Sequence, residues 1–160
     1  MDATPYQLLT LLAAAPSHIV AATADLSAAH LRAAPAPGEW SINDVLAHLR
    51  ACADVWGGCI ATILAQGEPS LRAVNPRTWL RQTDYLELDF APSLAAFTAQ
   101  RQALLAVLGP LPPAAWSRGA TVKGAGKTLR RTVFSYADWL ASHVRAHLKQ
   151  IARVAEAMRA

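Results

Sequence analysis

The sequence predicts an all-α protein, a four-helix bundle with short extra helical turns. Hydrophobic residues make up 53% of its 160 residues and charged residues only 16%, against about 25% charged in an average soluble protein. Much of the apolar fraction is alanine, the best helix former and the smallest core side chain. Four long stretches have helical periodicity, and no series of strand-like segments accompanies them. The length suits a single domain spanning residues 1–160.

The first long helix is expected from Pro5 to about Ala24. Thr4 has a side chain that caps helix N-termini, and Pro5 suits the first helical position because the N–H it lacks would have no helical partner there. Pro16 lies inside the stretch, where a proline removes one helical hydrogen bond. We therefore expect the helix to kink or restart at Pro16.

The second long helix is expected to begin at Ser41 and to continue to Gln66. Serine is a favoured N-cap residue, and Asp44 stands three residues later, where an acidic side chain supports the first turn. Gly67 follows the last periodic residue and is the expected stop signal.

The third and fourth long helices lie in the second half of the chain. The third is expected to start near Pro92 and to end at Leu108. The fourth is expected to run from Thr128, its N-cap, to about Met158, after a polar, glycine-containing loop over residues 117–127. Short helical turns are expected after Ser27, after Asn75-Pro76 and at residues 114–116.

The positive charge of the chain does not indicate a nucleic-acid partner. The formal net charge is +4, carried by twelve arginines and three lysines that are spread from Arg32 to Arg159. Arg130-Arg131 is the only adjacent basic pair. Proteins that bind nucleic acids usually gather basic residues into one face or stripe. We therefore expect solvated helix surfaces and no nucleic-acid binding.

The N-terminal region and the cysteines favour a cytoplasmic protein without a membrane segment. Residues 3–24 are apolar, but the chain begins Met1-Asp2 and has no Arg or Lys before Arg32, whereas a signal peptide begins with a positive segment. Two prolines also make this run a poor membrane span. Cys52 and Cys59 are seven residues apart, which fits neither a metal-binding pair nor a disulfide framework. We expect both thiols to be reduced.

Two histidines of the fourth helix are expected to point into the bundle. On a helical wheel, His143 and His147 lie within about 40° of the centre of the apolar stripe, while Arg145 and Glu156 lie on the opposite side. Burying two imidazoles costs free energy unless both find partners. Histidines four residues apart on one helix face are a common way to hold one metal ion. The alternative is a pair of core histidines that are satisfied by ordinary hydrogen bonds.

A third histidine, His48, lies at the edge of the apolar stripe of the second helix, from which it can reach a neighbouring helix. Three neutral nitrogen donors leave coordination positions open, as in reactive metal sites. Cys52, one turn later, is expected either near this site or as a plain core thiol. His18 and His30 are expected to be exposed. Position 144 is Val, so the segment lacks the glutamate of the HExxH proteases.

Two segments of the chain resemble the DinB-like (DinB/YfiT) superfamily. Residues 37–49 read PGEWSINDVLAHL and residues 141–151 read ASHVRAHLKQI, which are similar to the two signatures of that family. The resemblance implies a four-helix bundle with crossover connections and frequent homodimers. It also implies a divalent metal ion, nickel or zinc above all, with His48, His143 and His147 as its ligands.

The same resemblance implies a function. Some relatives are metal-dependent thiol S-transferases, so we expect an ion that activates a low-molecular-weight thiol, such as bacillithiol or mycothiol, for attack on a small electrophile. The alternatives are a metal-dependent hydrolase on the same site and a non-catalytic metal-binding or stress-response module. The sequence assigns no further catalytic residue. Carboxylate recognition or plain surface solvation is expected of Arg130, Arg131 and Arg145. The five tryptophans are expected in the core or in a dimer interface.

Overall fold

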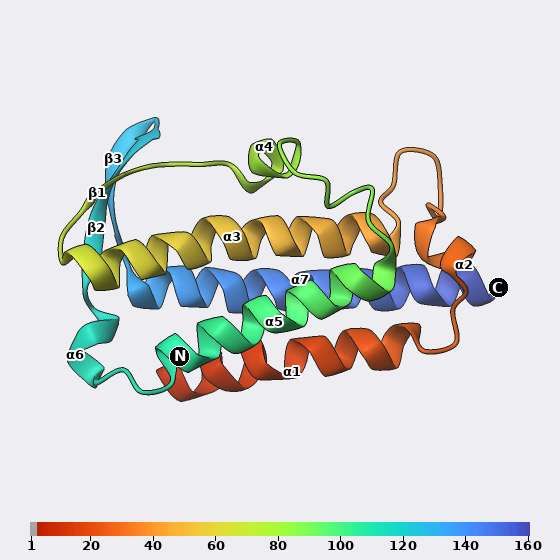
Figure 1. The fold of residues 1–160 in the computed structure, drawn as a ribbon, viewed down its shortest axis with the longest axis horizontal. Coiled ribbons are helices and arrows are strands. Elements are labelled where there is room, and N and C mark those ends of the chain that lie inside the picture. The colour runs from red at the N-terminus through yellow and green to blue at the C-terminus, as the bar shows by residue number, and fades with distance from the viewer. Residues whose placement is uncertain (1–2) are drawn as a thin grey trace.

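Four long helices pack lengthwise into a bundle (Figure 1). The structure is a computed structural model that describes residues 3–160. The long helices are α1 (Pro5–Thr23), α3 (Ile42–Gln66), α5 (Phe90–Leu108) and α7 (Val133–Arg159). The short helices are α2 (Ala28–Arg32), α4 (Pro76–Leu80) and α6 (Pro113–Trp116). A small sheet consists of β1 (Ser70–Arg72), β2 (Gly119–Ala125) and β3 (Lys127–Thr132). The predicted bundle with short extra helices is confirmed.

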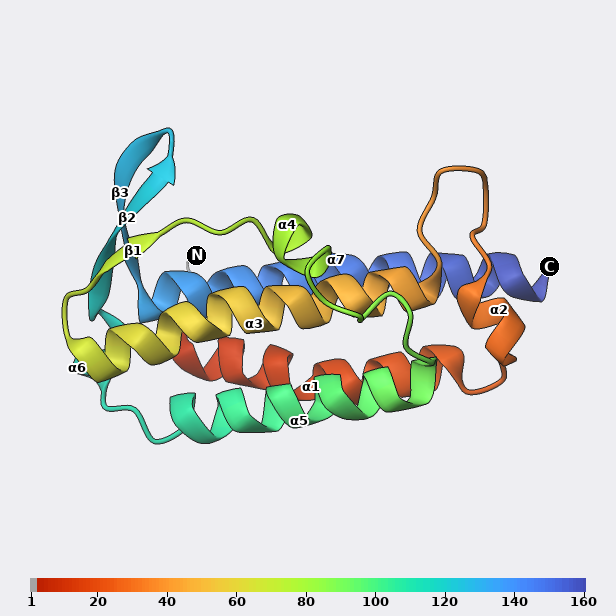
Figure 2. The same cartoon turned by 45° about the horizontal axis from the view of Figure 1, so that its top comes forward.

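A long connection between α3 and α5 gives the bundle its crossover. Helix α7 packs against α3 and α1, and α5 packs against the same two helices from the other side. After α3 ends, the chain returns along the bundle through β1 and α4 before α5 begins (Figure 1 and Figure 2). As a result, α3 and α5 run in the same direction, whereas neighbouring helices that are joined by a short loop run in opposite directions. The crossover also places α4 over the middle of α3.

Side-chain caps fix where the first two long helices begin. The Thr4 hydroxyl accepts a hydrogen bond from the backbone N–H of residue 7, and the Ser41 hydroxyl accepts one from the N–H of Asp44. Gly67 ends α3 with a positive φ of 87°, a conformation that favours glycine. These predicted ends are confirmed. Helix α1 continues through Pro16 because buried side chains on both sides hold it on the bundle; the restart considered there is wrong.

A β-hairpin stands where the sequence predicted a polar loop. Strands β2 and β3 pair antiparallel, and β1 pairs with β2 in parallel. In β2 the buried residues Ala120 and Val122 alternate with exposed ones, which is the period of a strand with one covered face. Gly124 and Gly126 adopt φ of 92° and 88° in the turn. This short alternating pattern carries too few residues to stand out against the surrounding polar composition.

The hairpin moves the start of the last helix. Thr128 was expected to be the N-cap, but it lies in β3, between Lys127 and Leu129, which both pair with β2. The N-cap is Thr132, whose hydroxyl accepts from the N–H of residue 135 at 3.0 Å, and α7 begins at Val133. Helix α5 begins at Phe90, two residues before the expected Pro92. The spacing of the histidines on α7 is unaffected by these shifts.

The core has two large clusters along the length of the bundle and a small third one around Leu80. One contains Cys52 and Leu140, and the other contains Val45 and Val144. His48, which lies on α3 between Val45 and Cys52, therefore stands where the two clusters meet. This places any site built on His48 at the middle of the bundle rather than at its end. Within residues 3–160, no helix combines the length and the apolarity needed to cross a membrane.

Arg101 of α5 is a buried cation that has no carboxylate partner among residues 3–160. Its side chain is 3% exposed, its Nη1 has no hydrogen-bond partner in the described part of the chain, and burial lowers its pKa to about 10. At pH 7 the guanidinium is charged in both the folded and the unfolded chain, so the folded chain bears the desolvation cost. We expect Arg101→Met to raise the free energy of unfolding by about 1–3 kcal/mol in urea denaturation.

The matched control for this prediction is Arg32→Met. Arg32 is exposed and lies 2.8 Å from Asp89, an ion pair that contributes about 0–1 kcal/mol. We expect its replacement to change stability by no more than that. A clear loss of stability in Arg101→Met would show that the guanidinium stabilises the fold.

Candidate metal centre

Three histidine rings from two helices meet in the middle of the bundle. His48 comes from α3, and His143 and His147 come from successive turns of α7. The Nε2 atom of His143 lies 2.9 Å from that of His48 and 3.1 Å from that of His147. His48 is 4% exposed, and the other two rings are half-buried. The structure thus brings together all three residues that the sequence singled out.

Hydrogen bonds among these rings cannot satisfy all three nitrogens. An imidazole nitrogen offers either one N–H or one lone pair, so the Nε2 of His143 can serve only one of its two Nε2 neighbours. The remaining contact is then left without a hydrogen bond of its own. A cation shared by the three lone pairs removes this conflict.

The spacing of the nitrogens also suits one shared ion. Two nitrogens that each lie about 2.0–2.1 Å from an ion are about 2.8–3.4 Å apart when the angle at the ion is about 90–110°. The observed separations of 2.9 and 3.1 Å fall within this range. The donor set and its geometry therefore fit a divalent metal ion.

The electrostatic environment keeps the rings in the neutral form that metals bind. Burial, together with the neighbouring rings and Arg77, lowers the pKa of His48 to about 4. Burial, His147 and Arg77 likewise lower the pKa of His143 to about 4. Burial and Arg77 also lower the pKa of His147, against a hydrogen bond to Gln150 that raises it. At neutral pH all three rings carry a free lone pair.

Gln150 fixes the orientation of one ring, and the sequence analysis did not identify it. The Nδ1–H of His147 donates to the Oε1 of Gln150 at 2.7 Å, so the proton is on Nδ1 and the lone pair is on Nε2. Ligating histidines usually donate their second N–H in this way. The signal in the sequence is the spacing of three residues on one helix face. The Nδ1 of His48 is buried and has no such partner among the described residues.

Cys52 lies beside the rings and is also buried in the core, so both positions that the sequence allowed for it hold. Its Sγ is 3.5 Å from the Nε2 of His48. The ligand atoms of Cys52, His48 and His143 all lie within 4.8 Å of one another, a group that could itself hold a metal ion. Cys52 is also a core residue, and burial raises its pKa to about 12. In the absence of a cation the sulfur therefore stays protonated.

Aromatic rings and one cation surround the triad. Trp40 stacks on His147 at a ring distance of 6.3 Å and an angle of 14°, and Trp56 meets His143 edge-on at 5.2 Å. Arg77 of α4 lies 5.1 Å from the Trp40 ring and lowers the pKa of all three histidines. The sequence does not predict that Arg77 lies beside the triad, because only the crossover brings α4 over α3.

Hydrogen bonds from α4 and the segment after it tie the crossover to α3. The Nε1–H of Trp79 donates to Asp54 at 2.9 Å, and the hydroxyl of Tyr85 donates to the same carboxylate at 2.7 Å. Asp54 lies on α3, less than two turns after His48. Its carboxylate therefore positions α4, and with it Arg77, over the triad.

The remaining histidines and the HExxH position behave as the sequence predicted. His18 and His30 are exposed and take no part in the triad. Val144 is buried in the core. Within residues 3–160, no carboxylate makes a hydrogen bond to the three rings. The site thus offers nitrogen donors but no acidic general base.

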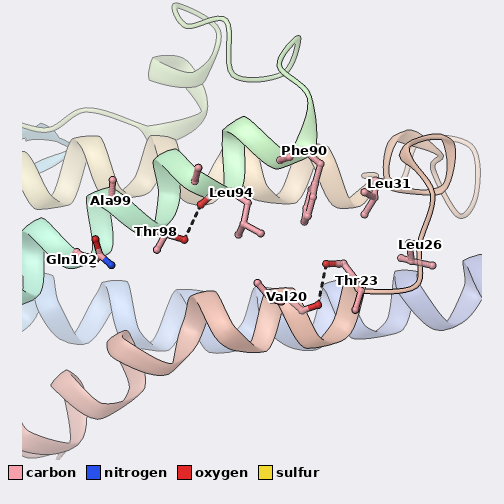
Figure 3. A pocket seen from close by; sticks show the side chains of 12 residues that line it. Val20, Thr23, Leu26, Leu31, Phe90, Leu94, Thr98, Ala99 and Gln102 are labelled. Atoms are coloured by element: carbon pink, nitrogen blue, oxygen red, sulfur yellow. Dashed lines mark hydrogen bonds between the residues drawn. The ribbon is translucent and has the colours of Figure 1, made fainter.

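A hollow between α1 and α5, away from the triad, has no side chain, among the described residues, of the kinds that usually bind a transition-metal ion. It has a volume of about 630 Å³, and its lining is largely apolar (Figure 3). The hydroxyls of Thr98 and Thr23 donate to carbonyls of their own helices, those of Leu94 and Ile19. In the part of the chain that the structure describes, no histidine, cysteine or acidic side chain lines it. The triad is therefore the stronger candidate for a functional site.

Gln150 provides a test of how the triad is held. We expect Gln150→Leu to lower the affinity of the chain for Zn²⁺ by about 10–100-fold, because His147 loses the acceptor that fixes its orientation. Gln150→Glu keeps an acceptor and should keep the affinity. Competition with a chromophoric chelator measures both, with Gln102→Leu on α5 as the control. Equal affinities in Gln150→Leu and Gln102→Leu would contradict this role.

Comparisons with known proteins agree with the fold and the two sequence segments. The model of the DinB superfamily matches residues 11–151, a range that includes all three histidines. The structure is similar to that of YfiT from Bacillus subtilis, which is described as a probable metal-dependent hydrolase with an unusual four-helix bundle topology. This likeness has a TM-score of 0.74 at 19% identity and covers 93% of this chain and 86% of that one. The comparison with curated proteins finds no match. The chain belongs to the DinB superfamily.

Proposed function

We propose that this chain is a divalent-metal-dependent enzyme in which His48, His143 and His147 hold the ion. The observation that carries the proposal is that the Nε2 of His143 lies within 2.9 Å of that of His48 and 3.1 Å of that of His147. Three protein ligands leave at least one coordination position for a small molecule. Nickel and zinc are the expected ions, because imidazole nitrogen suits both.

The reaction we favour is thiol S-transfer. A divalent ion in the triad supplies Lewis acidity, which lowers the pKa of a bound thiol or water. Activating water for hydrolysis commonly also needs a carboxylate base, and among residues 3–160 the possible ligand group around His48 contains Cys52 and His143 but no acidic side chain. A low-molecular-weight thiol, such as bacillithiol or mycothiol, is therefore the expected nucleophile, and a small electrophile is its partner.

The residues around the triad have defined roles in this proposal. Trp40 and Trp56 exclude water from two sides of the rings. Gln150 holds the lone pair of His147 toward the centre. Arg77 adds positive charge, which favours an anionic nucleophile over a neutral one. Cys52 remains a neutral thiol beside His48 and is not assigned a nucleophilic role.

Hydrolysis is the second candidate function, and one observation favours it. YfiT, which shares this fold, is described as a probable metal-dependent hydrolase. A hydrolase would act on an ester or amide without any thiol, whereas an S-transferase would consume thiol and electrophile together. The two functions use the same histidines, so mutation of the triad alone does not separate them.

To test the proposal, the metal-loaded protein is assayed with a panel of thiols. An aryl halide serves as the electrophile and an aryl ester as the substrate for hydrolysis. We expect thioether formation, and a rise in melting temperature with thiol, and we expect His147→Ala to lose both. Ester cleavage without thiol would instead establish the hydrolase. If metal-loaded protein ignores every thiol, halide and ester, the non-catalytic metal-binding or stress-response module becomes the better account.

A homodimer is also part of this proposal. The outer surface of the bundle exposes apolar side chains, among them Tyr6 at 78% and Val20 at 51% exposure, and a second copy of the chain would cover such residues at lower free-energy cost than water. Sedimentation equilibrium tests it: twice the mass of 17.1 kDa is expected, and a monomer at micromolar concentration would contradict it.

A further inference from the structure

Another cavity, separate from the hollow between α1 and α5, lies directly beside the triad. It has a volume of about 440 Å³ and lies between α3, α7, the β2–β3 hairpin and the crossover segment before α4. Trp56 belongs to both sites, because it lines this cavity and its ring meets that of His143 at 5.2 Å. Small-molecule sites in proteins have volumes of about 300–1,000 Å³. We call this cavity the arginine pocket.

Two guanidinium groups give the arginine pocket its positive charge. Arg72 of β1 and Arg131 of β3 line it, and no acidic side chain of the described residues does. Within the described chain, neither arginine has a carboxylate within 4.0 Å, and neither donates a hydrogen bond from its side chain. Arg130, which is adjacent in sequence, instead holds Glu68 at 2.6 Å. Of the adjacent pair Arg130 and Arg131, only the arginine that lines the pocket thus keeps its donors free.

Arg131 is held in place by an aromatic ring. Its guanidinium carbon lies 4.4 Å from the centre of the Trp139 ring, and a cation–π contact of this kind restricts the side chain without using its N–H donors. A planar guanidinium held in this way presents donors in a fork that matches a carboxylate. The pocket therefore offers a preorganised partner for an anion.

The other walls of the pocket suit a flat or apolar body. Trp56 and Trp139 lie 5.3 Å apart, and Trp139 is 40% exposed, so a ligand would cover apolar surface that now faces water. Among its other polar lining residues, Cys59 and Tyr136 are the titratable ones. Burial raises the pKa of both, and so neither adds negative charge at neutral pH.

We propose that the arginine pocket binds a small organic carboxylate with an aromatic or apolar body, with Arg131 and Arg72 on its carboxylate and Trp139 and Trp56 on its body. The assignment of this molecule as a reactant of the neighbouring triad rests on the proposed function. Binding itself does not, because no wall of the pocket is a triad histidine. The carboxylate can belong to the electrophile or to the thiol.

The test measures quenching of tryptophan fluorescence by 1-naphthoate, with 1-naphthamide as the uncharged analogue of the same shape. We expect 1-naphthoate to bind at least about tenfold more tightly than 1-naphthamide, and Arg131→Gln to remove this preference. Arg131→Lys keeps the charge but not the fork, and should retain part of it. Arg130→Gln is the matched control and should change the affinity by less than about twofold.

Three results would overturn the inference. These are equal binding of 1-naphthoate and 1-naphthamide, no binding of either, and equal losses in Arg131→Gln and Arg130→Gln. The thermal unfolding curve of each variant shows whether it is folded; if Arg131→Gln is unfolded, Arg72→Gln takes its place with the same expected loss.

Two further arms separate this inference from the proposed function. In His147→Ala we expect 1-naphthoate to bind as in the wild type, even if that variant binds no metal. Retained binding in a chain without any metal-dependent activity would support the pocket alone.

In metal-loaded wild type, displacement of 1-naphthoate by N-acetylcysteine but not by its amide places the carboxylate on the thiol; displacement by neither places it on the electrophile. Both outcomes support the pocket.

Discussion

His143→Ala is expected to lower the affinity of the chain for Zn²⁺ or Ni²⁺ by about a hundredfold or more. The Nε2 of His143 is the one that contacts both of the others, at 2.9 and 3.1 Å. Zinc sites with four ligands have binding free energies of about 10–16 kcal/mol, or about 2.5–4 kcal/mol for each ligand. Losing the binding free energy of one ligand therefore lowers the affinity by about 10²–10³-fold. Competition against a chelator of known affinity measures the change.

His30→Ala is the matched control for this prediction. His30 is exposed on α2 and has no contact with the triad, so its removal should leave the affinity within about twofold. His48→Ala should behave as His143→Ala does. If His143→Ala and His30→Ala bind the ion equally well, the ion is held elsewhere and the triad is a cluster of core histidines.

Acidification is expected to destabilise the metal-free chain between about pH 6.5 and pH 4. In the unfolded chain histidine has a pKa near 6.5, whereas burial lowers the pKa of His48 and His143 in the folded chain to about 4. Between these values the unfolded chain binds more protons, so the free energy of unfolding falls as the pH falls. Above about pH 7 the rings are neutral in both states and have no effect.

The size of this effect is limited by solvent screening. A shift of the full difference would correspond to about 3.4 kcal/mol for each ring, and we expect about 1–2 kcal/mol for each because the rings are only partly enclosed. Urea denaturation in the presence of a chelator, repeated across this range, measures the slope. His48→Gln should remove part of the slope, and His18→Gln, an exposed control, should leave it unchanged. Identical slopes in the wild type and His48→Gln would contradict the prediction.

The long helices could be predicted because their ends and faces depend on local chemistry. Ser41 caps α3 through its own hydroxyl, and Gly67 ends that helix through its own φ. The placement of His143 and His147 on one face follows from their spacing on one helix. His48 could be assigned to the same site because an apolar stripe must face the other helices.

The features that the sequence did not predict depend on contacts between distant segments. Thr128 was expected to cap a helix, and only the pairing of its neighbours Lys127 and Leu129 with β2 reveals that it lies in a strand. Arg77 reaches the triad because the crossover is tied to Asp54 of α3. The pairing of Arg130 with Glu68, which leaves Arg131 free to face the pocket, likewise joins residues far apart in the chain. Local propensity carries no information about such contacts.

X-ray absorption spectroscopy of the chain loaded with one equivalent of Zn²⁺ or Ni²⁺ tests the central claim most directly. The three Nε2 atoms of His48, His143 and His147 predict imidazole nitrogens in the first shell at about 2.0–2.1 Å and multiple-scattering features from three rings. The neighbouring Sγ of Cys52 lies 3.5 Å from the Nε2 of His48 and, on this account, stays outside that shell. A chain that takes up no ion, or an ion with a sulfur ligand at about 2.3 Å in place of a third imidazole, would contradict the account.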